Sequence, residues 1–230
     1  MEDLLKDLLL GEVPRRVFKR DDSGRFEGYQ EEFLAELAGM RGDVASRIAA
    51  WSPAARDPWE ELRRLACFDP RTGLPNQILF FDRLEVSLAR ARRERERLAV
   101  LAVDARIGPD DEVGEDSLFC QAARRLSRTL RRAETLATPG DGLFLAVITG
   151  IVGRKDAVTV AERLLAALEE PLPDGRRPCP EAAVGVALFP DHGEDARSLV
   201  ENAGEALRRL ELRGGGGYLV YRKEKTPGSN

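Results

Sequence analysis

Apolar residues follow two different spacings along the last two thirds of the chain. Short continuous apolar runs, which are typical of buried strands, occur at 98–105, 143–149, 182–188 and 218–222. Apolar residues at steps of three and four, which predict helices, occur at 76–93, 116–132, 155–169 and 195–211. Strands that alternate with helices in this way predict an α/β (α+β) fold, in which helices flank a central sheet.

The first fifty residues carry a stripe of large apolar side chains. Its members lie three or four positions apart and are Phe26, Tyr29, Phe33, Leu37, Met40, Val44, Ile48 and Trp51. This spacing predicts a helical N-terminal segment, residues 1–56, with one apolar face. A face of this size needs to be covered. Packing against the rest of the chain and association with a second copy or another protein both satisfy that need.

A domain boundary is predicted where Asp57, Pro58 and Glu60 form the start of a new helix. Asp57 supplies the N-cap acceptor, Pro58 fits the first helical position, and Glu60 is the carboxylate of a capping box. We therefore expect the main domain to cover residues 57–222, followed by a tail at 223–230.

The composition narrows the possible functions. Among 230 residues, 36 lysines and arginines nearly balance 40 acids, so no overall positive field favours nucleic acid or an anionic membrane. The three cysteines are widely spaced, form no CxxC pair and have no neighbouring histidine, since the single histidine is His192; this argues against a zinc site. No apolar stretch reaches membrane-spanning length, and the acidic start does not resemble a signal peptide. We expect a cytoplasmic protein.

The stretch ATPGDGLFLAV, residues 137–147, predicts a hairpin, because Asp141-Gly142 tolerates the positive φ of a tight turn between two apolar strands. Two further stretches accompany it. FDPRTGLPNQILFFDRL, residues 68–84, contains Asp69 and the run Thr72–Asn76. AVGVALFPDHGEDARSLVENAGEALRRL begins at Ala183.

In their order and spacing these stretches resemble a GGDEF domain over roughly residues 65–222. Asp69 and Thr72–Asn76 resemble its entry motif, D-x-L-T-G-L-P-N. The turn Gly140, Asp141, Gly142, Leu143 and Phe144 stands in the place of G-G-D/E-E-F. The resemblance implies a diguanylate cyclase fold, whose active members condense two GTP molecules into cyclic di-GMP across a pair of domains. That reaction uses two divalent cations held by carboxylates.

The turn departs from the family pattern at the positions that carry the chemistry. Asp104, at the end of the strand 98–105, matches the first metal-binding carboxylate of the family, but Gly142 and Leu143 stand where the other carboxylates are expected. Asp141 replaces the second glycine, and Glu211 replaces a phosphate-binding lysine. We therefore predict a pseudo-enzyme with no catalytic residues, no metal and no cofactor, in which Asp104 is vestigial.

One group of acids offers an alternative metal site, although acids before a helix are also typical first-turn caps. The group consists of Asp110, Asp111, Glu112, Glu115 and Asp116. We interpret these residues as caps.

Arg131 and Glu134 resemble the inhibitory product site of the family, R-x-x-D, with glutamate in place of aspartate. An arginine fork pairs with guanine O6 and N7 or with a phosphate, and a carboxylate accepts the guanine N1 and N2 protons. The alternative is that Arg131 ends a helix and Glu134 begins a strand.

Two hypotheses follow. The first is an inactive signalling scaffold that binds a protein partner, or forms a homodimer, through the N-terminal stripe of Phe26, Tyr29, Phe33, Leu37 and Trp51. The second is a cyclic di-GMP receptor that uses Arg131 and Glu134. Residual cyclase activity is a third reading. None of them includes nucleic-acid binding or membrane insertion.

Overall fold

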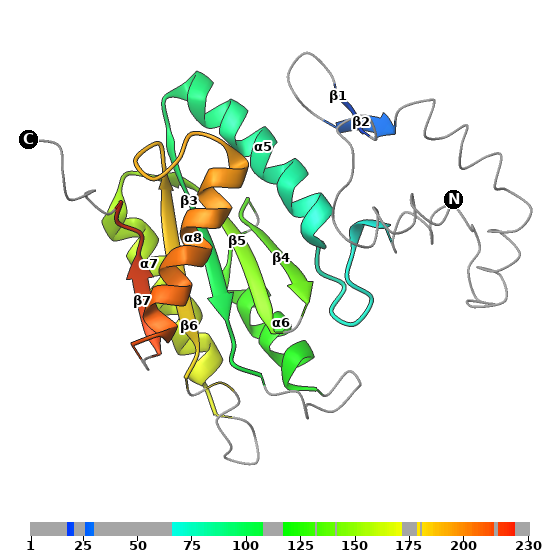
Figure 1. Ribbon diagram of the computed structural model, residues 1–230. Coiled ribbons are helices and arrows are strands. Elements are labelled where there is room, and N and C mark those ends of the chain that lie inside the picture. The colour runs from blue at the N-terminus through cyan, green and yellow to red at the C-terminus, as the bar shows by residue number, and fades with distance from the viewer. Residues whose placement is uncertain are drawn as a thin grey trace, which may run out of the picture.

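Figure 1 shows the computed structural model of the chain, a sheet with helices on both faces. The structure describes residues 66–107, 117–131, 133–140, 142–171, 179, 181–213 and 216–223, together with two short strands at 18–20 and 26–29. In chain order, the elements of the main domain are α5 (Gln77–Glu94), β3 (Arg97–Asp104), α6 (Leu118–Thr129), β4 (Thr135–Gly140), β5 (Leu143–Ile151), α7 (Arg154–Glu169), β6 (Ala183–Phe189), α8 (Ala196–Glu211) and β7 (Gly217–Val220).

The five strands lie in the order β4-β5-β3-β6-β7. All neighbouring strands are antiparallel except β6 and β7, which are parallel. Helices α5 and α8 cover one face of the sheet, and α6 and α7 cover the other (Figure 1). The predicted fold class is confirmed. Helix α6 is shorter than predicted because Ser117 caps it, its Oγ accepting the Cys120 N–H at 3.2 Å.

Strand β3 reads as a continuous apolar run because helices cover both of its faces. Its side chains alternate between the two cores. Leu101 and Val103 lie in the core formed with α6 and α7, whereas Val100 and Ala102 lie in the core formed with α5 and α8. By the same alternation, Asp104 at the end of the strand lies on the α5–α8 face.

Helix α8 packs closely on β6 because β6 contains a glycine at the contact. A Cβ atom added at Gly185 would lie 2.0 Å from the carbonyl oxygen of Ala203 and 2.4 Å from the backbone nitrogen of Leu207. A side chain at this position would therefore push α8 away from the sheet. Gly185 thus sets the depth at which α8, with Glu211 at its last turn, lies against the sheet.

The entry motif forms a local turn and a helix cap. Asp69 Oδ1 accepts hydrogen bonds from the backbone N–H and the hydroxyl of Thr72, at 2.8 and 2.5 Å. Gly73 takes a φ of +68°, where glycine is favoured. Asn76 Oδ1 then accepts the N–H of Leu79 at 3.2 Å and caps α5. In this chain the motif therefore forms the turn that precedes α5 and caps that helix.

The N-terminal prediction is wrong where the structure describes that region. Residues Phe18–Arg20 (β1) and Phe26–Tyr29 (β2) form an antiparallel pair. Phe26 and Tyr29 were predicted to belong to one helix, but both lie in the strand β2. Backbone pairing between the two segments therefore replaces the expected helix at residues 26–29.

The other N-terminal predictions lie outside the described residues. These are Phe33, Leu37 and Trp51 of the apolar stripe and the capping box at 57–60. The domain boundaries at 56 and 222 therefore stay predictions. Among the described residues, no helix is both long enough and apolar enough to cross a membrane.

Candidate functional site

The candidate site lies at the turn between β4 and β5. Gly140 pairs with Leu143 across the turn, and Gly140 and Gly142 have φ values of +111° and +77°. The buried side chain of Thr138 closes the hairpin: its hydroxyl donates to the Leu143 carbonyl at 2.7 Å and accepts the Gly140 N–H at 3.0 Å. The predicted hairpin is confirmed, while Asp141 lies outside the described residues.

The residues at the third and fourth positions of the family motif have no polar side chain. Gly142 has no side chain, and Leu143 has an apolar one. Phe144 is fully buried, and its ring lies 5.4 Å from that of Phe119 in the core formed with α6 and α7. Its role is therefore packing.

The hairpin is tied to two other parts of the site. Thr138 N–H donates to the carbonyl of Pro75 in the entry motif at 2.9 Å. On the other side, Asp104 pairs with Leu143 in the β3–β5 register, and the Ala105 N–H donates to the Gly142 carbonyl at 3.1 Å. The structure therefore places Asp104 beside the turn.

Asp104 is already engaged by an arginine two residues further along the chain. The Arg106 backbone N–H donates to Asp104 Oδ1 at 2.8 Å, and Arg106 Nε lies 3.2 Å from Oδ2. Arg106 has a φ of +52°, which is uncommon for a residue with a side chain. This conformation lets one residue place both its N–H and its guanidinium against one carboxylate.

Glu211, at the end of α8, is the third member of the site. Its Oε1 lies 4.0 Å from an Arg106 terminal nitrogen. Burial, a hydrogen bond with the Asp104 carboxylate and repulsion from that carboxylate raise the pKa of Glu211, and Arg106 partly offsets this effect. Two carboxylates from distant elements thus lie close together with one guanidinium against both.

These residues do not fit the divalent cations that the family resemblance implies. Such cations need several hard oxygen ligands. Both Asp104 oxygens face Arg106, and Gly142 and Leu143 supply no side-chain oxygen. In the part of the chain that the structure describes, no group of three or more His, Cys, Asp or Glu side chains is arranged to hold a metal ion. The acids at 110–116 lie outside that part.

Arg131 and Glu134 lie together between α6 and β4, and their hydrogen bonds use backbone groups of Arg131 and not its guanidinium. Glu134 Oε2 accepts the Arg131 backbone N–H at 2.6 Å, and the Arg131 carbonyl accepts the Glu134 N–H at 2.9 Å. This turn uses one carboxylate oxygen of Glu134. The Arg131 side chain is exposed, and among the described residues no carboxylate forms an ion pair with it.

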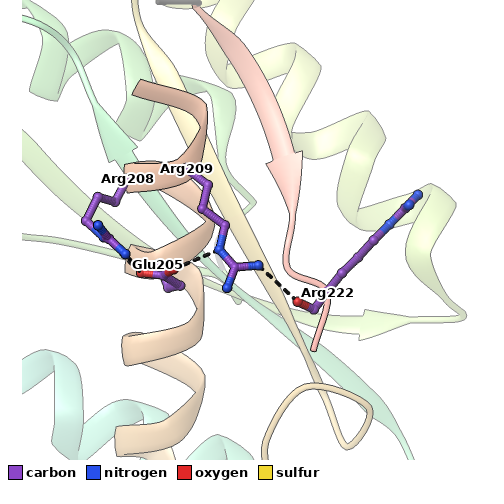
Figure 2. Close-up of polar contacts among 4 residues, drawn as sticks. All are labelled: Glu205, Arg208, Arg209 and Arg222. Carbon is purple, nitrogen blue, oxygen red and sulfur yellow. Dashed lines mark hydrogen bonds and ion pairs between the residues drawn. The ribbon is translucent and has the colours of Figure 1, made fainter. Parts of the chain in front are cut away.

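A second charged cluster anchors the last turns of α8 (Figure 2). Glu205 accepts hydrogen bonds from Arg208 at 2.7 and 2.9 Å and from Arg209 at 2.7 Å. Arg209 also donates to the Arg222 carbonyl, just after β7, at 3.2 Å. The Arg209 and Arg208 hydrogen bonds lower the pKa of Glu205. The cluster joins the end of α8 to the segment after β7.

Sequence reasoning missed Arg106. Its nearness in sequence to Asp104 is a weak signal, since arginine two residues after an aspartate is common on a surface. Its role depends on the left-handed backbone of Arg106 and on the arrival of Glu211 from α8, and neither is encoded by local spacing.

Comparisons with known proteins agree on the family and the fold of this chain. A family model described as "Diguanylate cyclase, GGDEF domain" matches residues 66–216. The diguanylate cyclase TpbB of Pseudomonas aeruginosa is 28% identical over 187 residues, which cover 77% of this chain and 43% of that protein. An uncharacterized signaling protein of Caulobacter vibrioides is 33% identical over 233 residues, which cover 97% of this chain and 27% of that protein.

A solved structure gives the same result. The crystal structure of the GGDEF domain of TpbB, also named YfiN, has a TM-score of 0.60 to this chain at 26% identity. The match covers 66% of this chain and 99% of that domain. The chain thus spans less than half the length of the two relatives described above.

Proposed function

The chain belongs to the GGDEF domain family, and on that premise we propose that it is a catalytically inactive signalling protein. It acts as a protein-interaction scaffold or adaptor in a cyclic di-GMP pathway. The observation that carries the inactivity is the pairing of Asp104 with Arg106, at 2.8 Å through the backbone N–H and 3.2 Å through the guanidinium.

Cyclase chemistry needs metal-bound oxygen atoms beside the triphosphate. In this chain the carboxylate that matches the first metal ligand of the family is neutralised by a guanidinium, and the turn supplies Gly142 and Leu143 in place of two carboxylates. Removing even one well-placed charge-stabilising group commonly lowers an enzymatic rate about 10²-fold or more. The loss of several such groups supports an inactive domain.

An assay of the full chain with GTP and either Mg²⁺ or Mn²⁺ tests this part of the proposal. We expect no cyclic dinucleotide above the level of an Asp104→Ala variant. Product that forms in the wild type and disappears in Asp104→Ala would overturn the inactivity.

The scaffold role is supported by a contrast: the chain retains the fold of the family but lacks carboxylates that the active site of the family uses. The Asn76 cap, the Thr138 closure of the hairpin and the Gly185 contact with α8 all serve the fold. Phe33, Leu37 and Trp51 of the N-terminal segment are the side chains that we propose contact a partner or a second copy. Sedimentation of the wild type beside a Phe33→Ala/Leu37→Ala variant tests the homodimer: a wild type that stays monomeric at tens of micromolar contradicts it.

Reception of cyclic di-GMP is the second candidate function, favoured by the exposed Arg131 side chain. A guanidinium that no carboxylate of the described residues holds is available for guanine or phosphate. The Glu134 carboxylate already accepts the Arg131 N–H, so it retains one oxygen for the guanine edge. Calorimetric titration with cyclic di-GMP separates this function from the scaffold.

A further inference from the structure

We propose that Arg106 takes the place of a divalent cation: its guanidinium lies against the Asp104–Glu211 carboxylate pair and closes this site to metal ions. The proposal deepens the proposed function, on which it rests, by assigning the residue that keeps the site inactive. It concerns three side chains from the end of β3, the segment after it and the end of α8.

The geometry favours a positive charge beside Asp104 and Glu211. Asp104 lies on the α5–α8 face of the sheet by the alternation of β3, and the close packing of α8 at Gly185 sets Glu211 near it. Two carboxyl groups held together in partly buried surroundings repel each other when both are ionised, and this repulsion is relieved by the hydrogen bond between Glu211 and Asp104 or by a cation against both. Arg106 contacts both, with Nε 3.2 Å from Asp104 and a terminal nitrogen 4.0 Å from Glu211.

The backbone of Arg106 favours this role over that of an ordinary surface arginine. Its φ of +52° is a conformation that side-chain-bearing residues rarely adopt. The conformation is held by the hydrogen bond from the Arg106 N–H to Asp104 Oδ1 at 2.8 Å. The same carboxylate therefore fixes the backbone and receives the guanidinium.

A metal ion and Arg106 exclude each other at this site. A cation that binds Asp104 through Oδ2 has to displace the guanidinium from its contact there, and a guanidinium that stays nearby repels it. Without the guanidinium, two carboxylates and bound waters remain, a ligand set of the kind that Mg²⁺ accepts. Removing Arg106 is therefore expected to create metal binding where the wild type has none.

Thermal unfolding of the full chain with and without MnCl₂ or MgCl₂ tests the proposal. The wild type is expected to show the same midpoint in both conditions. Arg106→Ala is expected to unfold at a lower temperature without metal and to gain about 3–5 °C at roughly tenfold metal excess over Kd. A double variant, Arg106→Ala/Asp104→Asn, is expected to lose that gain.

Arg95→Ala is the matched control. Arg95 is also an exposed arginine with a left-handed backbone, at a φ of +55°, but it lies before β3, at the opposite end of the strand from Arg106. We expect no metal response from this variant. Arg106→Lys keeps the charge and is expected to stay insensitive to metal. Arg106→Gln serves as a second neutral variant if Arg106→Ala does not fold.

Two outcomes overturn the proposal: a metal-dependent midpoint in the wild type, or no metal response in both neutral variants. Its failure is distinguishable from failure of the proposed function. An inactive wild type whose neutral variants ignore metal contradicts only the role of Arg106. A wild type that makes cyclic di-GMP contradicts the inactivity itself.

Discussion

The backbone N–H of Leu188 donates to Nδ1 of His192 at 3.1 Å, which closes the turn after β6. This hydrogen bond requires an imidazole whose Nδ1 carries no proton. Burial lowers the pKa of His192; Asp191 raises it in part, and Arg154 lowers it further. The side chain of Asn202 donates to the His192 carbonyl at 2.6 Å and joins the same turn to α8.

The free energy of unfolding is therefore expected to depend on pH through His192. The pKa of His192 is lower in the folded chain than in the unfolded chain. The contribution of neutral His192 to the free energy of unfolding is therefore fully present above about pH 6.5, the usual pKa of histidine. It is lost as the pH falls below that value toward the lower folded pKa. Urea unfolding between pH 7.5 and 5 measures the loss.

His192→Gln is the control, because His192 is the only histidine of the chain. The difference in stability between wild type and variant should shrink as the pH falls. Glu211 acts with the opposite sign: its raised pKa makes stability fall as the pH rises. For this reason the prediction concerns the difference between the two proteins. A difference that is constant with pH would contradict it.

Gly185→Ala is expected to destabilise the fold by roughly 2–3 kcal/mol or more, because its Cβ would overlap the α8 backbone. Gly204→Ala is the matched control in α8. A Cβ at Gly204 meets no atom within 4 Å, so helix propensity should raise stability there by about 0.5–1 kcal/mol. Chemical unfolding of both variants measures the two effects, and equal effects would refute the close contact.

Asn76→Ala is expected to lower the free energy of unfolding by about 1–2 kcal/mol, since α5 loses its N-cap. The loss also removes the hydrogen bond from Asn76 Nδ2 to the Ala66 carbonyl at 2.8 Å. Asn76→Asp separates the two contributions, because aspartate keeps the acceptor for Leu79 and lacks the donor. We expect its unfolding midpoint between those of the wild type and Asn76→Ala.

Arg131→Ala is expected to weaken calorimetric binding of cyclic di-GMP if the chain is a receptor. Loss of a charged hydrogen-bonding group of this kind costs about 1.5–3 kcal/mol, or about ten- to a hundredfold in Kd. Arg128 lies in the last turn of α6, before Arg131. Arg128→Ala removes an equal charge and controls for nonspecific attraction. Binding that is equally weakened in both variants, or unchanged in Arg131→Ala, would exclude the Arg131 site.

Most of the main domain is predictable from the sequence because its signals are local. The apolar run 98–105 corresponds to β3, Arg97–Asp104, and the helical spacing of 195–211 corresponds to α8, Ala196–Glu211. Glycines at 140 and 142 mark a hairpin because few other residues adopt their backbone conformations. Local spacing failed at Phe26–Tyr29, where pairing with Phe18–Arg20 replaced the expected helix.

The sequence by itself determined the family resemblance, the order of strands and helices, and the replacement of two turn carboxylates by Gly142 and Leu143. Only the tertiary structure decided that Glu211 lies beside Asp104. Glu211 lies 107 positions further along the chain, and it reaches Asp104 only because α8 packs on Gly185 and because β3 directs its last side chain toward that helix. Such a contact depends on the packing of whole elements, so no spacing within the sequence encodes it.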